Sequence, residues 1–216
     1  MTQFWDPVIL SLQTALTAGL LVIVAGILIG GFMARRRFRG KVIVETLLIL
    51  PLVLPPSVVG FFLIVIFGKN SAVGQMIESL FGHPVIFTWW AAVIASSVVA
   101  FPLMYQSAKT GFESVNSEIE DAARIDGAGE WKRFLFITLP LSIKALISGA
   151  ILSFTRALGE FGATLMFAGN IPGKTQTMPT AIYVALDMGD MKMAWAWVIA
   201  TVIISFIMLV STYFFK

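Results

Sequence analysis

The 216-residue sequence contains no cysteine and a single histidine, His83. The absence of cysteine excludes disulfide bonds, thiolate metal sites and thiol nucleophiles, and one histidine excludes a multi-histidine metal centre. Charged residues are also scarce, because they make up 12% of the chain against about 25% in soluble domains. Such a chain has too little polar surface to cover a water-facing globule.

Apolar residues take the place of the missing charge. They make up 58% of the chain, and the mean hydropathy is +0.90. The 18 glycines and six tryptophans also fit a membrane protein, because Gly is frequent in membrane helices and Trp gathers at membrane interfaces.

Four uncharged runs are long enough to cross a bilayer, which takes about 20 residues. They cover residues 7–34, 46–68, 84–108 and 193–215. A further candidate lies between Lys144 and Gly173, where Arg156 and Glu160 interrupt the apolar sequence. We therefore predict an all-α, polytopic membrane protein of about five transmembrane helices, with one transmembrane domain over residues 1–216.

The positive charges indicate how the chain crosses the membrane. Five of them follow the first apolar run directly: Arg35, Arg36, Arg37, Arg39 and Lys41. Placing this cluster in the cytoplasm gives eleven Lys and Arg residues inside and three outside, as the positive-inside rule requires. The N-terminus is then outside and the C-terminus cytoplasmic. This placement marks topology and not a nucleic-acid surface, so the expected surroundings are the lipid bilayer.

The longest cytoplasmic connection under this topology covers residues 109–144. Ser117 and Glu120 have the spacing of a capping box, which predicts a helix starting at Glu118. Gly127 is suited to ending that helix, because it can adopt the left-handed conformation. A second helical run follows and is expected to stop at Pro140. The connection is therefore predicted to be a helix-turn-helix.

This connection resembles a known signature. Asp121-Ala122-Ala123, Gly127, Ile137 and Leu139-Pro140 have the spacing of the EAA loop in permease subunits of ATP-binding-cassette importers, where Glu replaces Asp121. The resemblance implies that the short helix docks in a cleft of a cytoplasmic ATPase. The ATPase-coupling residues would be Glu118, Asp121, Ala122, Ala123, Gly127, Ile137, Leu139 and Pro140. Taken without the resemblance, the two alanines are equally compatible with plain helix propensity.

Three other segments, residues 51–60, 158–164 and 169–175, are similar to those of molybdate and tungstate permeases. This resemblance implies ATP-driven import of molybdate or tungstate by a homodimer. Its partners would be two ATPase subunits, which bind ATP and Mg²⁺, and an external oxyanion-binding protein. Sulfate permeases share part of the second segment, so a sulfate or other oxyanion permease remains an alternative. An ATP-independent channel or carrier and a non-transporting scaffold also stay open.

Several residues inside the apolar segments are candidates for the translocation path or for packing. Arg156 and Glu160 are one helical turn apart, so they form either a structural ion pair or part of the path of an anion. Prolines 51, 55 and 56 are expected to break the second helix, as a kink or along a path. The full candidate set is Pro55, Pro56, Ser57, Arg156, Glu160 and Thr164.

No catalytic constellation is present in the sequence. The only histidine lies in an expected external loop, so a Ser/His/Asp set is not credible. Residues 168–175 read A-x-x-x-x-G-K-T, but they follow a membrane segment and not a strand, and they contain Pro172, which argues against a phosphate-binding loop. We therefore expect a transport subunit that binds no cofactor or metal itself, and not an enzyme.

Overall fold

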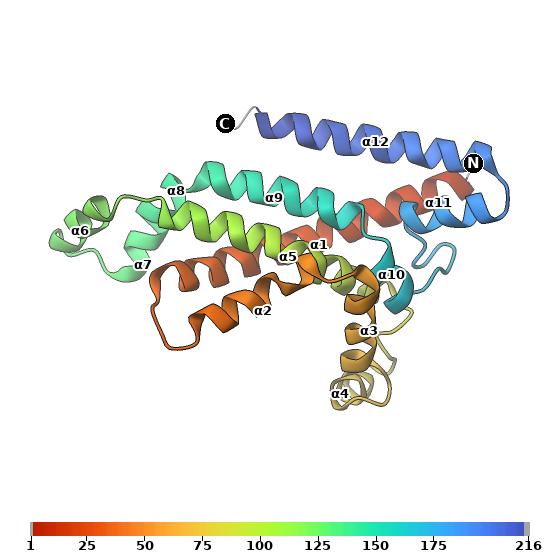
Figure 1. The fold of residues 1–216 in the computed structure, drawn as a ribbon, viewed down its shortest axis with the longest axis horizontal. Coiled ribbons are helices and arrows are strands. Elements are labelled where there is room, and N and C mark those ends of the chain that lie inside the picture. Colours follow the sequence, from red (N-terminus) through yellow and green to blue (C-terminus); the bar gives the residue numbers. More distant parts are fainter. Residues whose placement is uncertain (1, 214–216) are drawn as a thin grey trace.

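The computed structural model of the chain describes residues 2–213, and this range is built of helices and turns without a β-strand. Figure 1 shows an elongated bundle in which the long helices run side by side along one axis. They are α1 (Thr2–Arg35), α5 (Trp89–Glu113), α9 (Ile143–Leu158) and α12 (Met191–Tyr213).

The core forms where α1, α5 and α9 pack together. Small residues bring the helices close, and a Cβ atom on Gly30 of α1 would lie 3.0 Å from the Cβ of Ala108 on α5. Close packing of this kind drives helix association in membranes, where the lipid is as apolar as the side chains. By contrast, α12 lies at the edge of the bundle and is largely exposed.

The five apolar segments predicted from the sequence are present, but only three are continuous helices of sufficient length, namely α1, α5 and α12. The second segment folds as α2 (Lys41–Val53) and α3 (Pro56–Phe67), which meet at 116°. The fourth predicted segment, between Lys144 and Gly173, instead contains α9 and α10 (Gly162–Phe167). The second bent pair joins α9 to residues 130–141 of the predicted cytoplasmic connection, at 72°. The count of five holds when each bent pair is one span.

The expected proline break lies at Leu54, just before Pro55, where the backbone is extended (ψ 144°). Proline disfavours a helical conformation at the residue that precedes it, which explains this position. The prediction was wrong for Pro51, which stays inside α2.

Three short helices lie where the sequence predicted connections or a continuous span: α4 (Ala72–Phe81), α10 (Gly162–Phe167) and α11 (Met178–Asp187). The N-terminus of α11 is tied to α1, because Met178 N donates a hydrogen bond to Ser11 Oγ at 2.7 Å. A membrane span needs about 20 residues, so the search for long apolar runs in the sequence did not find these helices.

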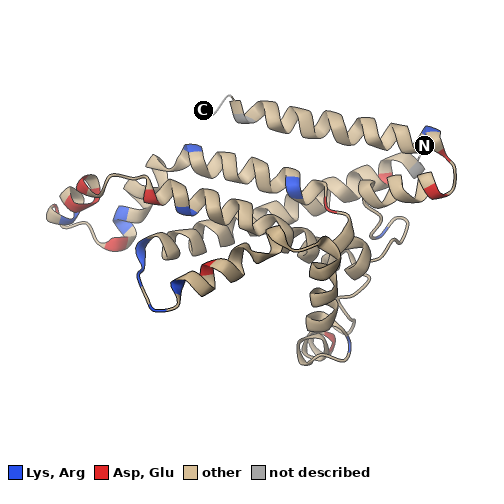
Figure 2. Cartoon of the chain, viewed as in Figure 1, with Lys and Arg blue, Asp and Glu red and all other residues tan. Residues whose placement is uncertain are grey.

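Basic residues gather at one end of the molecule, around the α1–α2 connection and the α5–α9 connection, as Figure 2 shows. At this end Lys109 of α5 forms an ion pair of 2.6 Å with Glu45 of α2. The N-terminal end of α1 lies at the opposite end. This arrangement agrees with the grouping of positive charges used for the topology, whereas the side on which each terminus lies stays a prediction.

Candidate functional site: the coupling helix and its contacts

The helix carrying the EAA-like motif is α6 (Ser117–Ile125), which protrudes at the basic end of the bundle (Figure 1). It begins one residue earlier than expected, and its N-cap is Asn116, whose side-chain oxygen accepts from Glu118 N at 2.9 Å. The predicted capping box of Ser117 and Glu120 was therefore wrong. Asn is as good a cap as Ser, and Glu120 has another partner.

The predicted end of α6 is confirmed. Gly127 has φ +84°, its N–H donates to Arg124 O at 3.1 Å, and Ala128 N donates to Ala123 O at 2.9 Å. These two bonds form a Schellman motif, which satisfies the last carbonyl groups of the helix. A left-handed residue is required at this point, so the glycine has a conformational reason to be there.

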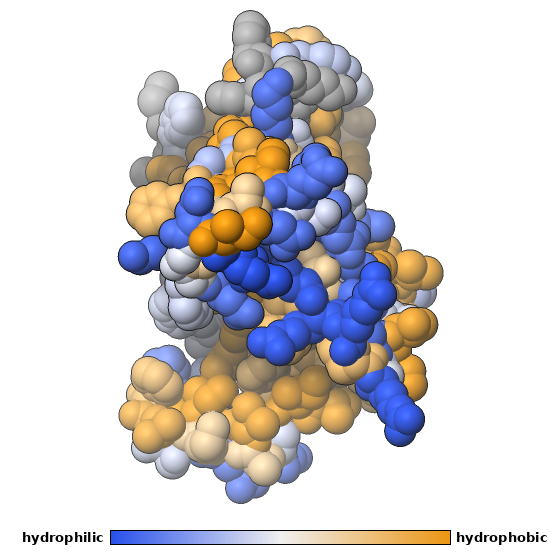
Figure 3. Space-filling model, turned by 90° about the vertical axis from the view of Figure 1, so that its left-hand side faces the viewer, coloured by the Kyte–Doolittle hydropathy of each residue, from blue (hydrophilic) through white to orange (hydrophobic). Residues whose placement is uncertain are grey.

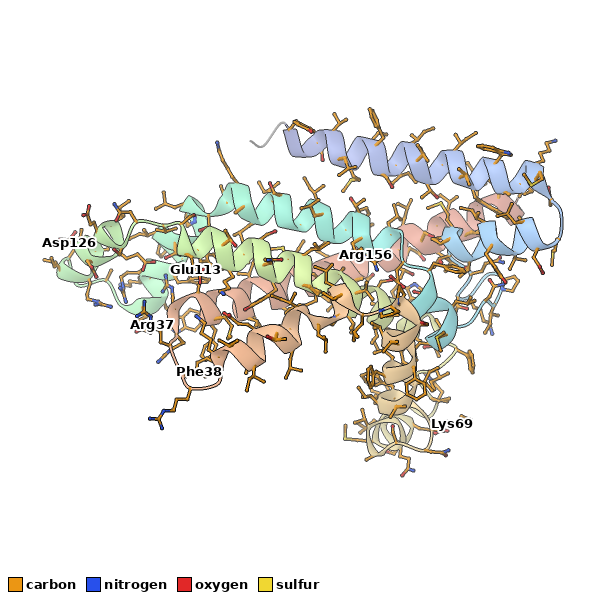
Figure 4. All side chains as sticks on the ribbon, viewed as in Figure 1. Arg37, Phe38, Lys69, Glu113, Asp126 and Arg156 are labelled. Carbon is orange, nitrogen blue, oxygen red and sulfur yellow. The ribbon has the colours of Figure 1, made fainter. Side chains whose placement is uncertain are left out.

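One face of α6 is exposed. Glu118, Asp121, Ala122 and Ile125 are three or four residues apart and therefore share this face, and all four are exposed. Ile125 is 87% exposed. In the end-on view of Figure 3, an apolar patch stands out among hydrophilic residues, and Figure 4 places Asp126 at the tip of the protrusion. This face therefore combines an exposed apolar side chain with the carboxylates of Glu118 and Asp121, and it carries the motif that resembles the EAA loop.

The opposite face of α6 binds the rest of the chain. Glu120 Oε1 lies 2.6 Å from Arg35 Nη2, at the end of α1. The Thr138 hydroxyl hydrogen-bonds to both groups, and the Arg35 guanidinium lies 5.3 Å from the ring centre of Phe134. Sequence reasoning missed this network, because Arg35 was assigned to topology and Glu120 to a cap.

The predicted second helical run is also longer than expected. It consists of α7 (Glu130–Arg133), a π-helical segment η1 (Phe134–Thr138) and α8 (Leu139–Leu141). It does not stop at Pro140, because that residue lies within α8, which follows η1 without a break. At the end of η1, Leu139 N donates a hydrogen bond to Phe134 O, five residues earlier. π-helical turns of this kind are frequent at functional sites.

The motif positions in this run differ in their surroundings. Leu139 packs against the core, Ile137 is half-buried and Pro140 is exposed. The bend into α9 follows at Ser142, whose buried hydroxyl donates to Gly111 O of α5 at 2.9 Å. The structure thus brings α6, η1 and the start of α9 into one network with α1 and α5.

Within the apolar segments, the expected pair of Arg156 and Glu160 is present at 2.7 Å. Because α9 ends at Leu158, Glu160 lies beyond it and caps α10, accepting from Ala163 N at 2.9 Å. The Glu160 side chain is 1% exposed and that of Arg156 is 31% exposed. The pair therefore has a structural task, which is to hold the break between α9 and α10.

The proline-containing break of the second segment lies beside α10. A Cβ atom on Gly162 would lie 2.8 Å from the Pro56 Cβ. Pro55, Pro56 and Ser57 are exposed, whereas Thr164 is fully buried and its hydroxyl lacks a hydrogen-bond partner. The structure therefore joins two distant candidate segments, with Thr164 in the packing and the prolines at the surface.

The A-x-x-x-x-G-K-T segment forms turns. Its buried Thr175 hydroxyl accepts from Ile171 N at 3.0 Å, and the next helix, α11, begins only at Met178. Among residues 2–213, His, Asp and Glu side chains form no group of three able to hold a metal ion.

With this geometry established, comparisons with known proteins define the class. Residues 26–216 match the family described as "Binding-protein-dependent transport system inner membrane component". The chain belongs to this family, and it is a multi-pass inner-membrane transport protein.

Three relatives with a named substrate are similar to this chain over most of its length. The chain is 64% identical over 208 residues to the "Putative molybdenum transport system permease protein YvgM" of Bacillus subtilis strain 168, covering 96% of this chain and 92% of the relative. It is 43% identical to "Molybdenum transport system permease protein ModB" of Escherichia coli K12, over 85% and 80% of the two chains. It is 33% identical to "Sulfate transport system permease protein CysT" of the same strain, over 94% and 76%.

Solved structures share the fold. A chain of the inward-facing "MetNI methionine ABC transporter" superimposes with a TM-score of 0.75 at 15% identity, over 97% of this chain and 91% of that one. A chain of a bacterial ABC transporter for the polysaccharide alginate gives a TM-score of 0.69 at 18% identity, over 96% and 77%. The chain therefore has the fold of an ABC transporter permease.

Proposed function

We propose that this chain is the permease subunit of an ATP-driven importer of molybdate or tungstate. The observation that carries the proposal is the 64% identity to a molybdenum transport permease over 96% of the chain. It is supported by the exposed face of α6, which carries the EAA-like motif.

The energy source in this proposal is a separate ATPase, which binds ATP and Mg²⁺. Two such subunits would lie beneath a homodimer of this chain, with the exposed α6 face in a cleft of each ATPase. This places the basic end of the bundle in the cytoplasm, the N-terminus outside and an external oxyanion-binding protein at the opposite end. The charge asymmetry of the sequence supports this orientation.

The contacts of α6 suggest how movement is passed on. Closure of the ATPases on ATP would displace α6, and the network of Arg35, Glu120 and Thr138 joins α6 to the end of α1. The hydrogen bond from Ser142 to Gly111 joins the bend before α9 to α5. The ATPase movement would thus reach all three core helices, and the dimer would alternate between inward and outward openings.

The second candidate is sulfate, because CysT shares 33% identity over 94% of this chain. Tetrahedral dianions differ little in charge, so discrimination rests on size and on hydrogen bonding to the oxygen atoms. We propose that the external binding protein makes most of this discrimination.

The test is uptake by the complete complex reconstituted in vesicles. We expect ATP-dependent uptake of labelled molybdate that unlabelled molybdate or tungstate suppresses, while sulfate at the same concentration has little effect. Uptake of labelled sulfate in place of labelled molybdate, or stronger suppression by sulfate than by unlabelled molybdate, would assign the chain to sulfate. Uptake that persists with a hydrolysis-deficient ATPase would instead indicate an ATP-independent carrier.

A further inference from the structure

A cavity of about 730 Å³ lies between the end of α1 and the underside of α6 and α7. Four arginines and two glutamates line it: Arg35, Arg36, Arg124, Arg133, Glu120 and Glu130. The positive charges exceed the negative ones by two. Apolar side chains of α1, including Leu28 and Phe32, form the rest of the wall.

The cavity does not coincide with the docking face of α6. Glu120 and Arg124 line it and are one helical turn apart, so they share a face. Ala122 and Ile125 lie on the other side of the same helix. An ATPase bound to the outer face would therefore leave the cavity between α6 and the membrane domain.

Arg133 is a buried cation in the wall of the cavity, and its Nε atom lacks a hydrogen-bond partner among the described residues. The residue is 6% exposed. None of the ion pairs among the described residues includes Arg133. Of the two glutamates that line the cavity, Glu120 is paired with Arg35, and Glu130 is not within ion-pair distance of Arg133. A buried guanidinium that makes no ion-pair contact is costly, so an anion bound to it would be stabilising.

We infer that this cavity is a binding site for a phosphate-class anion, in which Arg133 is the buried ligand and Arg36 a second cation at the rim. Guanidinium groups match the geometry of phosphate oxygens and bind them through paired hydrogen bonds. Two sources have this chemistry: the phosphate of an anionic lipid headgroup and a free inorganic oxyanion. The wall of Leu28 and Phe32 suits an acyl chain beside the headgroup, and basic pockets of this kind at the cytoplasmic side bind lipid headgroups.

The test uses the purified full-length chain, stripped of lipid in detergent. Phosphatidylglycerol, phosphatidylcholine and inorganic phosphate are added separately. Thermal unfolding measures stabilisation, and native mass spectrometry counts retained phospholipid. Arg133→Gln removes the buried charge, and Arg39→Gln is the matched control, because Arg39 is an exposed cation at the same end that does not line the cavity.

We expect phosphatidylglycerol to stabilise and remain bound to the wild type and to Arg39→Gln. Arg133→Gln should weaken this binding by roughly tenfold to a hundredfold, the loss expected for hydrogen bonds to a charged group. Stabilisation by inorganic phosphate that depends on Arg133, with no preference for phosphatidylglycerol, would identify a free oxyanion as the source. Binding of neither anion, or equal binding by Arg133→Gln and Arg39→Gln, would overturn the inference.

A second variant guards against misfolding of Arg133→Gln. Arg36 is exposed and lines the cavity, so Arg36→Gln should fold normally and weaken anion binding by a smaller factor. Unchanged anion affinity in Arg36→Gln, together with failure of Arg133→Gln to fold, would count against the site.

Discussion

Glu120 of α6 and Arg35 of α1 are joined by an ion pair of 2.6 Å although 85 positions separate them in the chain. Their side chains are 23% and 29% exposed. Thr138 hydrogen-bonds to both, so the pair is held by a third group and by the Phe134 ring. This contact is the most direct link between the proposed coupling helix and a core helix.

The Arg35–Glu120 pair should be required for coupling. Arg35→Gln and Glu120→Gln are each expected to lower transport per ATP hydrolysed, because α6 then moves without α1. A double-mutant cycle on the unfolding free energy should give a coupling of about 0.5–3 kcal/mol. The exchange Arg35→Glu with Glu120→Arg should recover part of the transport. Additive effects on stability and on transport would show that the pair does not act as a unit.

Two substitutions of Gly127 should separate backbone strain from loss of coupling. Gly127 has φ +84° and a Cβ atom there would meet nothing within 4 Å, so Gly127→Ala is expected to cost about 1–2 kcal/mol of backbone strain alone. Gly127→Pro should uncouple transport, because proline fixes φ near −65° and removes the N–H that donates to Arg124. Uptake and ATPase rates measured on both variants test this. Normal import by Gly127→Pro would contradict the proposed role of the turn.

Ile125 should be an anchor for the ATPase. Ile125→Ser is expected to weaken ATPase binding by about tenfold or more, as loss of an interface hot spot does, with little change in thermal stability because the side chain is 87% exposed. Met188, 78% exposed in the turn between α11 and α12, provides the control Met188→Ser. Affinity measured by co-purification or surface binding should fall only in the first variant. Equal affinities would place the docking surface elsewhere.

Gly111 should be intolerant of any side chain. A Cβ atom there would lie 2.7 Å from Ala145 Cβ, so Gly111→Val is expected to destabilise the protein by about 1–3 kcal/mol through overpacking and to displace the acceptor of the Ser142 hydroxyl. Gly129→Val is the matched change at a site with nothing within 4 Å. Thermal unfolding should separate the two variants, and similar stabilities would show that α9 can shift to make room.

Variants of Arg156 and Glu160 should distinguish packing from transport. Arg156→Gln is expected to destabilise more than Glu160→Gln, because it leaves a carboxylate that is 1% exposed without its counter-charge, whereas Arg156 is 31% exposed. The double variant should recover stability and still lack the cation. If oxyanion uptake remains low in this stable double variant, Arg156 is part of the path. Normal uptake would limit the pair to holding α9 and α10.

Part of the candidate site was predictable because it depends on local chemistry. The end of α6 was found from Gly127, since few residues adopt a left-handed conformation. An ion pair of Arg156 with Glu160 was one of the two alternatives that their four-residue spacing left open. The N-cap of α6 was assigned to Ser117, with the helix starting at Glu118, whereas the N-cap is Asn116 and the helix starts at Ser117. Both residues are good caps. The sequence alone does not show that Glu120 pairs with Arg35 instead of completing a capping box with Ser117.

The amino-acid sequence by itself determined the membrane class, the five apolar segments and the grouping of positive charge, because each depends on composition along the chain. Only the tertiary structure decided that Pro51 stays inside α2 while the break lies at Leu54, that residues 130–141 and α9 meet at an angle, that α11 is tied to α1, and that Glu120 reaches Arg35. These features depend on which distant surfaces meet, and a bend or an ion pair forms only where the partner element lies close enough to satisfy the exposed backbone or charge.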